Sequence, residues 1–180
     1  KKILEDYSLW DNNDCWMAVG SVDSDDKDLN NAAIIGSQQS NAANALVEKI
    51  VNCGDSALLL RCQEEGIDIQ GDEAPENVKN AMEKFLDLDD GRWINMTPTE
   101  GTLLAKKYCN VVATGEKGRN SNPTYTIIDN CEGQDPIDFK KTFMSLTRKN
   151  KMTVKFVQGK FGMGSFGAVN FCTKYGLQLI

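Results

Sequence analysis

The longest regular pattern in the chain runs from Asn41 to about Glu65. Alanine and leucine are frequent there and no proline interrupts, so the stretch predicts a single long helix. Ser40 is a suitable N-cap and Gly66 a suitable stop. The preceding residues, 1–40, give no clear periodicity and are interpreted as a separate N-terminal segment.

Three polar side chains of this helix fall on one narrow stripe. At about 100° per residue, Glu48, Asn52 and Asp55 lie within an arc of roughly 60°, while apolar side chains cover most of the remaining circumference. A surface helix normally has a broad polar face of mixed charge. The narrow stripe fits a helix that lies under a polar cavity, and the solvated edge of a surface helix is the alternative.

The next segment, residues 66–107, predicts a helical insertion. One helix is expected to begin at Pro75 and to end at Asp89–Gly91. A capping box formed by Thr97 and Glu100, with a proline at the first helical position, opens a second helix.

Strands are predicted after the insertion. Residues rich in β-formers predict a strand pair, Tyr108–Thr114 and Thr124–Ile128, joined by a turn-rich loop. A short helix is expected at 138–146, and two further short strands at 154–157 and 176–180.

Composition narrows the chemistry that is available to the chain. It has 180 residues, a net charge of −6 and no histidine, so Ser–His and Cys–His catalysis and histidine phosphorylation are excluded within it. Its six cysteines form no C-x-x-C pair, which argues against zinc and favours free thiols in a reducing compartment. No apolar run reaches the roughly 18 residues of a membrane span.

Charge is distributed unevenly along the chain. Residues 137–180 hold eight Lys or Arg against one acidic residue, whereas residues 1–136 hold twelve against twenty-five. The basic part contains Gly159–Gly167, in which four of nine residues are glycine. Glycine lets backbone N–H groups approach a phosphate chain, and surrounding positive charge attracts one. A solvated basic face is the alternative.

The glycine stretch matches more than one nucleotide-binding pattern. Residues 162–167 satisfy the G-x-G-x-x-G of dinucleotide-binding folds, and residues 162–169 satisfy the glycine-rich loop of protein kinases. Both folds need a long downstream segment, and only thirteen residues follow Gly167. Residues 159–164 satisfy a third pattern, G-x-x-G-x-G.

Three separated segments together resemble the sequence boxes of the GHKL ATPases, which include gyrase, the large heat-shock chaperones, histidine kinases and MutL. The segments are Glu48-x-x-x-Asn52-x-x-Asp55-Ser56, which resembles the N-box, Asp129–Gly133, which resembles D-x-G-x-G, and Gly159–Gly164, which resembles the second glycine box. Their order and spacing are most similar to the MutL, MORC and chaperone-like branch. Cys131 replaces the first glycine of D-x-G-x-G, and Ser56 replaces an alanine.

The resemblance covers about residues 40–180 and implies a fold. That fold is a two-layer α+β sandwich, with helices on one face of a mixed, mostly antiparallel sheet. The ATP-binding domain would span residues 41–180 and would carry the helical insertion at about 66–107.

The resemblance also implies roles for individual residues. Glu48 would be the catalytic base for the attacking water, and Asn52 would offer its amide oxygen to Mg²⁺. Asp129 would accept a hydrogen bond from the adenine amine, and Gly133 would let the backbone approach the base. Asp55 belongs to the predicted ATP-binding set, and a contact from its carboxylate to backbone is the preferred interpretation.

The implied phosphate contacts lie in the second glycine box and the basic loop before it. Glycine N–H groups would bind the phosphates, and lysines would neutralise developing charge. The predicted ATP-binding residues of this region are Lys149, Gly159, Lys160, Phe161, Gly162, Met163 and Gly164. Met163 is interpreted as packing rather than as a direct ligand contact.

The implied function is Mg²⁺-dependent ATP binding and hydrolysis, driving conformational change or homodimerisation of a larger protein. DNA or a protein client would be engaged through further domains. The alternative is a nucleotide-sensing or interaction module without significant hydrolysis, because Cys131 would crowd the adenine side and the family often takes a catalytic lysine from a following domain. A scaffold that binds no nucleotide is a third hypothesis. The expected location is the cytoplasm, without membrane contact.

Overall fold

The structure is a computed structural model that combines helices with an antiparallel hairpin, and its class is α+β. It describes residues 5–8, 11–12, 41–115, 123–135, 137, 153–159, 167–168 and 171–172. The helices and strands are α3 (Ala42–Glu64), α4 (Val78–Leu86), α5 (Pro98–Tyr108), β1 (Cys109–Thr114) and β2 (Thr124–Asp129), with short 3-10 turns η3 (Asp89–Gly91) and η4 (Trp93–Asn95). The predicted helix at 138–146 and strand at 176–180 lie outside the described residues.

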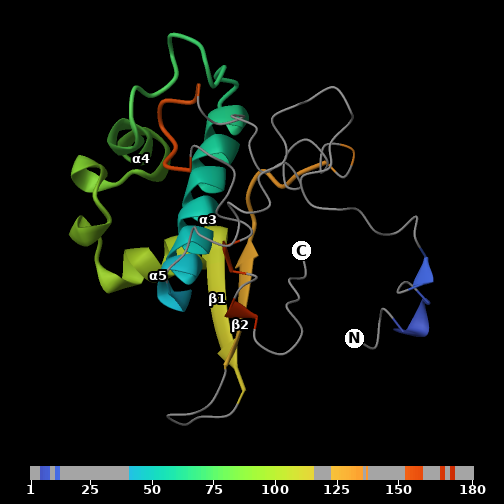
Figure 1. The fold of residues 1–180 in the computed structure, drawn as a ribbon. Helices are drawn as coiled ribbons and strands as arrows, with labels where there is room; N and C mark the ends of the chain where they lie inside the picture. The colour runs from blue at the N-terminus through green and yellow to red at the C-terminus, as the bar shows by residue number, and fades with distance from the viewer. Residues whose placement is uncertain are drawn as a thin grey trace.

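Helix α3 is the central element, and it confirms the predicted long helix. It contacts α4, α5 and both strands, so its sides face different parts of the molecule (Figure 1). Its N-cap is Asn41, whose side chain accepts a hydrogen bond from the N–H of Asn44 at 2.8 Å. The prediction of Ser40 as the cap was therefore wrong by one residue. Gly66, at φ +70°, follows the last turn as expected.

The insertion contains the two predicted helices, but the first begins later than expected. Asn77 is the N-cap of α4 and accepts from the N–H of Asn80, whereas Pro75 is buried before the helix. The amide side chain of Asn77 satisfies a free helical N–H, whereas Ala74, which would precede a start at Pro75, has no side chain that can do so. The helix also ends earlier, at Leu86, and Asp89–Gly91 forms the separate turn η3.

The capping box of α5 is confirmed in both directions. The hydroxyl of Thr97 accepts from the N–H of Glu100 at 3.3 Å, and the carboxylate of Glu100 accepts from the N–H of Thr97 at 2.8 Å. These hydrogen bonds from the Thr97 side chain and backbone lower the pKa of Glu100. Pro98 is the first helical residue, and strand β1 follows α5 without a linker.

The predicted strand pair is confirmed as an antiparallel hairpin. Its register pairs Cys109 with Asp129 at one end and Thr114 with Thr124 at the other. The first strand begins one residue later than predicted, because Tyr108 is the last residue of α5. The second strand extends one residue beyond the prediction, so Asp129 is its last residue. The hairpin packs against α3, and Asp129, at the end of β2, lies beside Cys53 of this helix.

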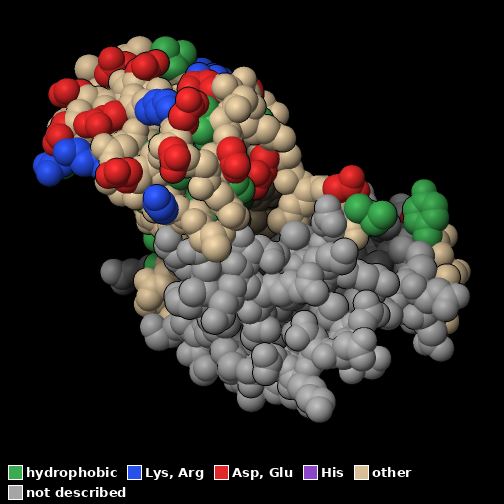
Figure 2. All heavy atoms as spheres, turned by 90° about the horizontal axis from the view of Figure 1, so that it is seen from above, with side chains coloured by type: hydrophobic (Ala, Val, Ile, Leu, Met, Phe, Trp, Pro, Cys, Tyr) green, Lys and Arg blue, Asp and Glu red, His purple; other side chains and the backbone are tan. Residues whose placement is uncertain are grey.

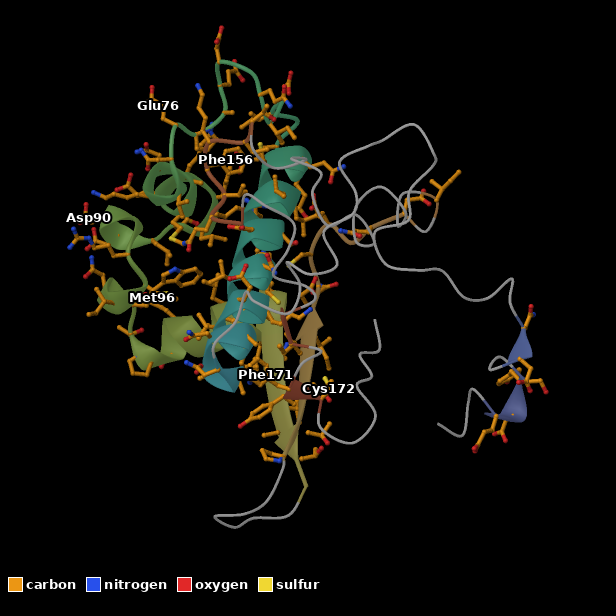
Figure 3. The ribbon with its side chains drawn as sticks, in the orientation of Figure 1. Glu76, Asp90, Met96, Phe156, Phe171 and Cys172 are labelled. Atoms are coloured by element: carbon orange, nitrogen blue, oxygen red, sulfur yellow. The ribbon has the colours of Figure 1, made fainter. Side chains whose placement is uncertain are left out.

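The strand predicted at 154–157 is wrong, because this segment forms turns. Val154, Phe156 and Val157 are all buried. A strand would turn Phe156 and Val157 to opposite faces, whereas the turns let all three side chains enter one core. Phe156 packs edge-to-face on Phe85 of α4 with ring centroids 6.2 Å apart, between α4 and α3 (Figure 3).

Two glycines at positive φ provide a matched test of how η3 packs on α4. A Cβ on Gly91, at φ +56°, would collide with the backbone carbonyl of Lys79, whereas a Cβ on Gly66, at φ +70°, would meet open space. Both alanine substitutions strain the backbone by about 1 kcal/mol, and only Gly91→Ala adds the collision. We expect Gly91→Ala to lower the free energy of unfolding by at least about 2 kcal/mol in urea denaturation. Equal losses for the two variants would contradict the described packing of η3 on α4.

Candidate functional site

The predicted catalytic and metal-binding side chains lie along one side of α3. Glu48 and Asn52 are half-buried, and Asp55 is only 2% exposed. Glu48 and Asn52 are separated by one helical turn, which brings their side chains to the same face. The predicted ATP-binding residues outside the described part are Lys149, Lys160, Phe161, Gly162, Met163 and Gly164.

The carboxylate of Asp55 holds the start of the glycine stretch. One oxygen accepts the backbone N–H of Gln158 at 2.9 Å, and the other accepts the N–H of Gly159 at 2.7 Å. A buried carboxylate requires such partners, because leaving water without them is strongly unfavourable. The interpretation of Asp55 as a contact from the helix to backbone is confirmed, and it joins the first box to the third.

Gly159 lies close to α3. A Cβ at this position would lie 3.1 Å from Oδ1 of Asn52 and 3.1 Å from Oδ2 of Asp55. Both distances are tighter than ordinary contacts, so a larger residue would require these side chains to shift by a few tenths of an ångström. The backbone of Gly159 therefore lies directly against the predicted magnesium ligand.

The second box approaches α3 from the hairpin. Asp129 ends β2 and is exposed, and its Oδ2 lies 3.9 Å from the thiol of Cys53 on α3. The N–H of Asn130 donates to the carbonyl of Tyr108 at 3.1 Å, which fixes the start of the turn. Gly133 has φ +65° with open space around it, so this turn needs glycine for its backbone conformation.

Cys131 turns its sulfur towards the protein. Its Sγ lies 3.6 Å from the carbonyl oxygens of both Cys53 and Tyr108, and the side chain packs against the core cluster. This orientation removes the reason for expecting the sulfur to crowd an adenine base. Cys131 instead connects the Asp129 turn to α3 and to the junction between α5 and β1.

The thiols at this contact are held in their protonated form. Burial raises the pKa of Cys131 to about 12, and the charge of Asp129 adds to the effect. Burial, followed by the neighbouring Cys109 thiol, likewise raises the pKa of Cys53. Protonated thiols are hydrogen-bond donors, and a carboxylate beside them is an acceptor.

Residues 52–55 of α3, in the first box, thus contact parts of the other two boxes on two sides of the helix. Asn52 and Asp55 contact the glycine stretch, and Cys53 between them contacts the Asp129 turn. The contacts made by Cys53, Cys131 and Gln158 were not predicted as part of the site. The spacing of Cys53 on the apolar side of the helix indicated burial, and nothing in the sequence marked its partner.

Lys49 adds a half-buried cation beside Glu48. Burial lowers the pKa of this lysine, and the nearby Cys172, Cys53 and Glu48 partly offset the effect. It lies on the same helix as the polar stripe, one residue after the predicted base, and the sequence pattern did not single it out.

A separate groove of about 500 Å³ lies on the insertion. It is lined by Val78, Lys79, Met82, Gly91, Arg92, Trp93, Ile94 and Gln158. Gln158 is adjacent to the glycine stretch, but the lining includes none of the predicted nucleotide contacts. This groove is therefore distinct from the contacts that α3 makes with Gly159 and with the Asp129 turn.

Among the residues that the structure describes, no group of three or more Cys, Asp or Glu is arranged to hold a metal ion. No helix there is both long and apolar enough to cross a membrane.

No protein-family model matches the chain, and neither the curated proteins nor the solved structures yield a match.

The contact made by Asp55 can be tested with a nearly isosteric change. Asp55→Asn replaces one acceptor oxygen with an NH₂ group that faces a backbone N–H, and it removes the charge that strengthens the remaining hydrogen bond. We expect the free energy of unfolding to fall by about 2–3 kcal/mol in urea denaturation. Asp72→Asn, at an exposed position, is the control. An unchanged midpoint for Asp55→Asn would show that the two N–H bonds do not contribute to stability.

Proposed function

We propose that this chain is a Mg²⁺-dependent ATP-binding domain of the GHKL type, which hydrolyses ATP to drive conformational change in a larger protein. The observation that supports the proposal is that residues 52–55 of α3, in the first box, contact parts of the other two boxes. These boxes are separated by up to about a hundred positions, and Asp55 and Gly159 are in direct hydrogen-bonding contact. Chance resemblances in three unrelated segments give no reason for such contacts.

The phosphate end of the proposed site lies where Asn52 faces Gly159. Mg²⁺ is a hard ion that prefers oxygen ligands, and the amide oxygen of Asn52 suits it. When bound, Mg²⁺ would neutralise phosphate charge. The backbone of Gly159, held against Asn52 and Asp55, would begin the loop whose N–H groups bind the same phosphates.

The base end of the proposed site lies at the Asp129 turn. Asp129 is exposed at the end of β2, so its carboxylate is accessible to a ligand. An ionised carboxylate accepts hydrogen bonds and cannot donate them, which suits the exocyclic amine of adenine and not the carbonyl of guanine. Asp129 lies beside Cys53, the residue that follows Asn52 in α3, and this closeness supports the proposal.

Glu48 is proposed as the general base. Its half-buried carboxylate lies one turn before Asn52, on the face of the predicted polar stripe. A water bound near Asn52 would be within reach of Glu48, which would accept its proton as the water attacks the terminal phosphate. The remaining contacts position the nucleotide.

The cellular compartment, the clients and the response to nucleotide are also proposals. Free thiols in the described part fit a reducing compartment such as the cytoplasm. Figure 2 shows acidic side chains spread over the described helical face, which does not favour phosphate-tracking by this surface. We therefore place DNA or protein clients on further domains and propose homodimerisation as the response to nucleotide.

The role of Glu48 separates an ATPase from a nucleotide-sensing module. Glu48→Gln keeps the side-chain shape and removes the base, so turnover should fall by about 10²–10⁴-fold while Mg-ATP affinity stays within about threefold. Steady-state phosphate release and calorimetry measure the two quantities. Glu76→Gln, at an exposed site, is the control. ATP binding by the wild-type chain without measurable turnover would favour the sensing module instead.

The role of Asp129 in binding the base is tested by the affinity for ATP. Asp129→Asn exchanges an acceptor oxygen for a donor, so the affinity for ATP should fall by about tenfold or more. Calorimetry with Mg-ATP measures the loss, and Asp135→Asn is an exposed control in the same region. Unchanged ATP affinity would remove Asp129 from the proposed base contact.

A further inference from the structure

We propose that Cys131 is a positioning residue that, together with Cys53, holds Asp129 in place and thereby sets the selectivity of the site for adenine. This inference rests on the proposed function and concerns its base end. The two residues are called the cysteine clasp below. Neither is proposed to touch the nucleotide or to take part in the chemistry.

The first part of the clasp is the anchoring of the turn by Cys131. Its thiol lies 3.6 Å from the carbonyl of Cys53 on α3 and 3.6 Å from the carbonyl of Tyr108 at the end of α5. A single side chain thus joins the turn after β2 to two helices. Its half-buried position against the core cluster adds apolar contact to these weak sulfur hydrogen bonds.

The second part of the clasp is the contact of Cys53 with the carboxylate. The Cys53 thiol donates towards Oδ2 of Asp129 across 3.9 Å, from a buried position on α3. One oxygen of Asp129 is thereby oriented towards the helix, which leaves the other for a ligand. Because Cys131 binds the carbonyl of Cys53, the two contacts support each other.

Electrostatics favours this arrangement over a wide pH range. Burial raises the pKa of both thiols, so they remain neutral donors beside the Asp129 carboxylate. A thiolate here would repel the carboxylate, and a glycine at 131 would leave both carbonyls without this donor. The thiol of Cys131 therefore makes contacts with these carbonyls that the glycine of the motif cannot make.

The experiment compares Cys131→Gly, Cys131→Ser and Cys53→Ala with wild type. Cys62→Ala is a matched control, since Cys62 is a buried cysteine of α3 whose thiol donates to the carbonyl of Ile67 at 3.5 Å, away from Asp129. Calorimetry measures the affinity for Mg-ATP, Mg-GTP and Mg-tripolyphosphate. Thermal unfolding records any general loss of stability.

The clasp predicts a loss that is specific to adenine. Cys131→Gly and Cys53→Ala should reduce the ratio of ATP to GTP affinity by about five- to tenfold and leave tripolyphosphate affinity unchanged. Cys131→Ser keeps a donor and should recover most of the ratio. Cys62→Ala should lower the melting temperature and leave the ratio unchanged.

Two other outcomes overturn the inference. If Cys131→Gly and Cys53→Ala keep the wild-type ratio, or if tripolyphosphate affinity falls in parallel with ATP affinity, the clasp has no positioning role. These results are distinguishable from failure of the proposed function. That failure would appear as absent ATP binding in wild type, or as an Asp129→Asn variant that binds ATP unchanged, and it would overturn both.

Discussion

The buried carboxylate of Asp55 is the interaction on which the arrangement of this molecule depends. It receives two backbone N–H groups from a segment more than a hundred residues away in sequence. A carboxylate with only 2% exposure would be very unfavourable without such donors, so the helix and the segment stabilise each other. The same contact brings Val154, Phe156 and Val157 into the core between α3 and α4. One side chain thus joins α3 to Gln158 and Gly159, which directly follow this buried segment.

Helix α3 separates two kinds of environment along its length. Its C-terminal half carries Leu58, Leu59 and Cys62 into the main core. Further towards the N-terminus, Asn52 and Asp55 lie against Gly159, and Cys53 contacts the hairpin turn. This division explains how a short polar stripe can exist on a largely apolar helix. The apolar part secures the helix, and the polar part is thereby held in a fixed position.

The elements that sequence reasoning predicted well are those with strong local signals. The capping box at Thr97 and the β-forming runs of the hairpin specify their conformations through neighbouring residues, and both are confirmed. The predicted start of α4 at Pro75 is wrong because the side chain of Asn77 caps the helix two residues later. The strand predicted at 154–157 is wrong because the conformation of these apolar residues is determined by their packing against α3 and α4. No local sequence pattern indicates that packing.

In the candidate site, too, the features with a local sequence signal were predicted and those that depend on distant packing were not. The stripe of Glu48, Asn52 and Asp55 follows from helical periodicity alone, and Asp55 was correctly interpreted as a backbone contact. The partners of that contact and the inward rotation of Cys131 depend on side-chain packing between distant segments. The sequence marked Cys131 as a departure from a motif, and only the three-dimensional arrangement gives its sulfur a set of neighbours.

The absence of a linker between α5 and β1 determines where this chain tolerates changes of length. The Tyr108 carbonyl, at the end of α5, accepts from both Asn130 and Cys131, so one inserted residue at this junction would shift the helix against the turn. The stretch between α3 and α4 is different, because each helix has its own terminal signal at Gly66 or Asn77. Relatives with longer or shorter insertions should therefore vary between residues 67 and 76 and keep the α5–β1 junction constant in length.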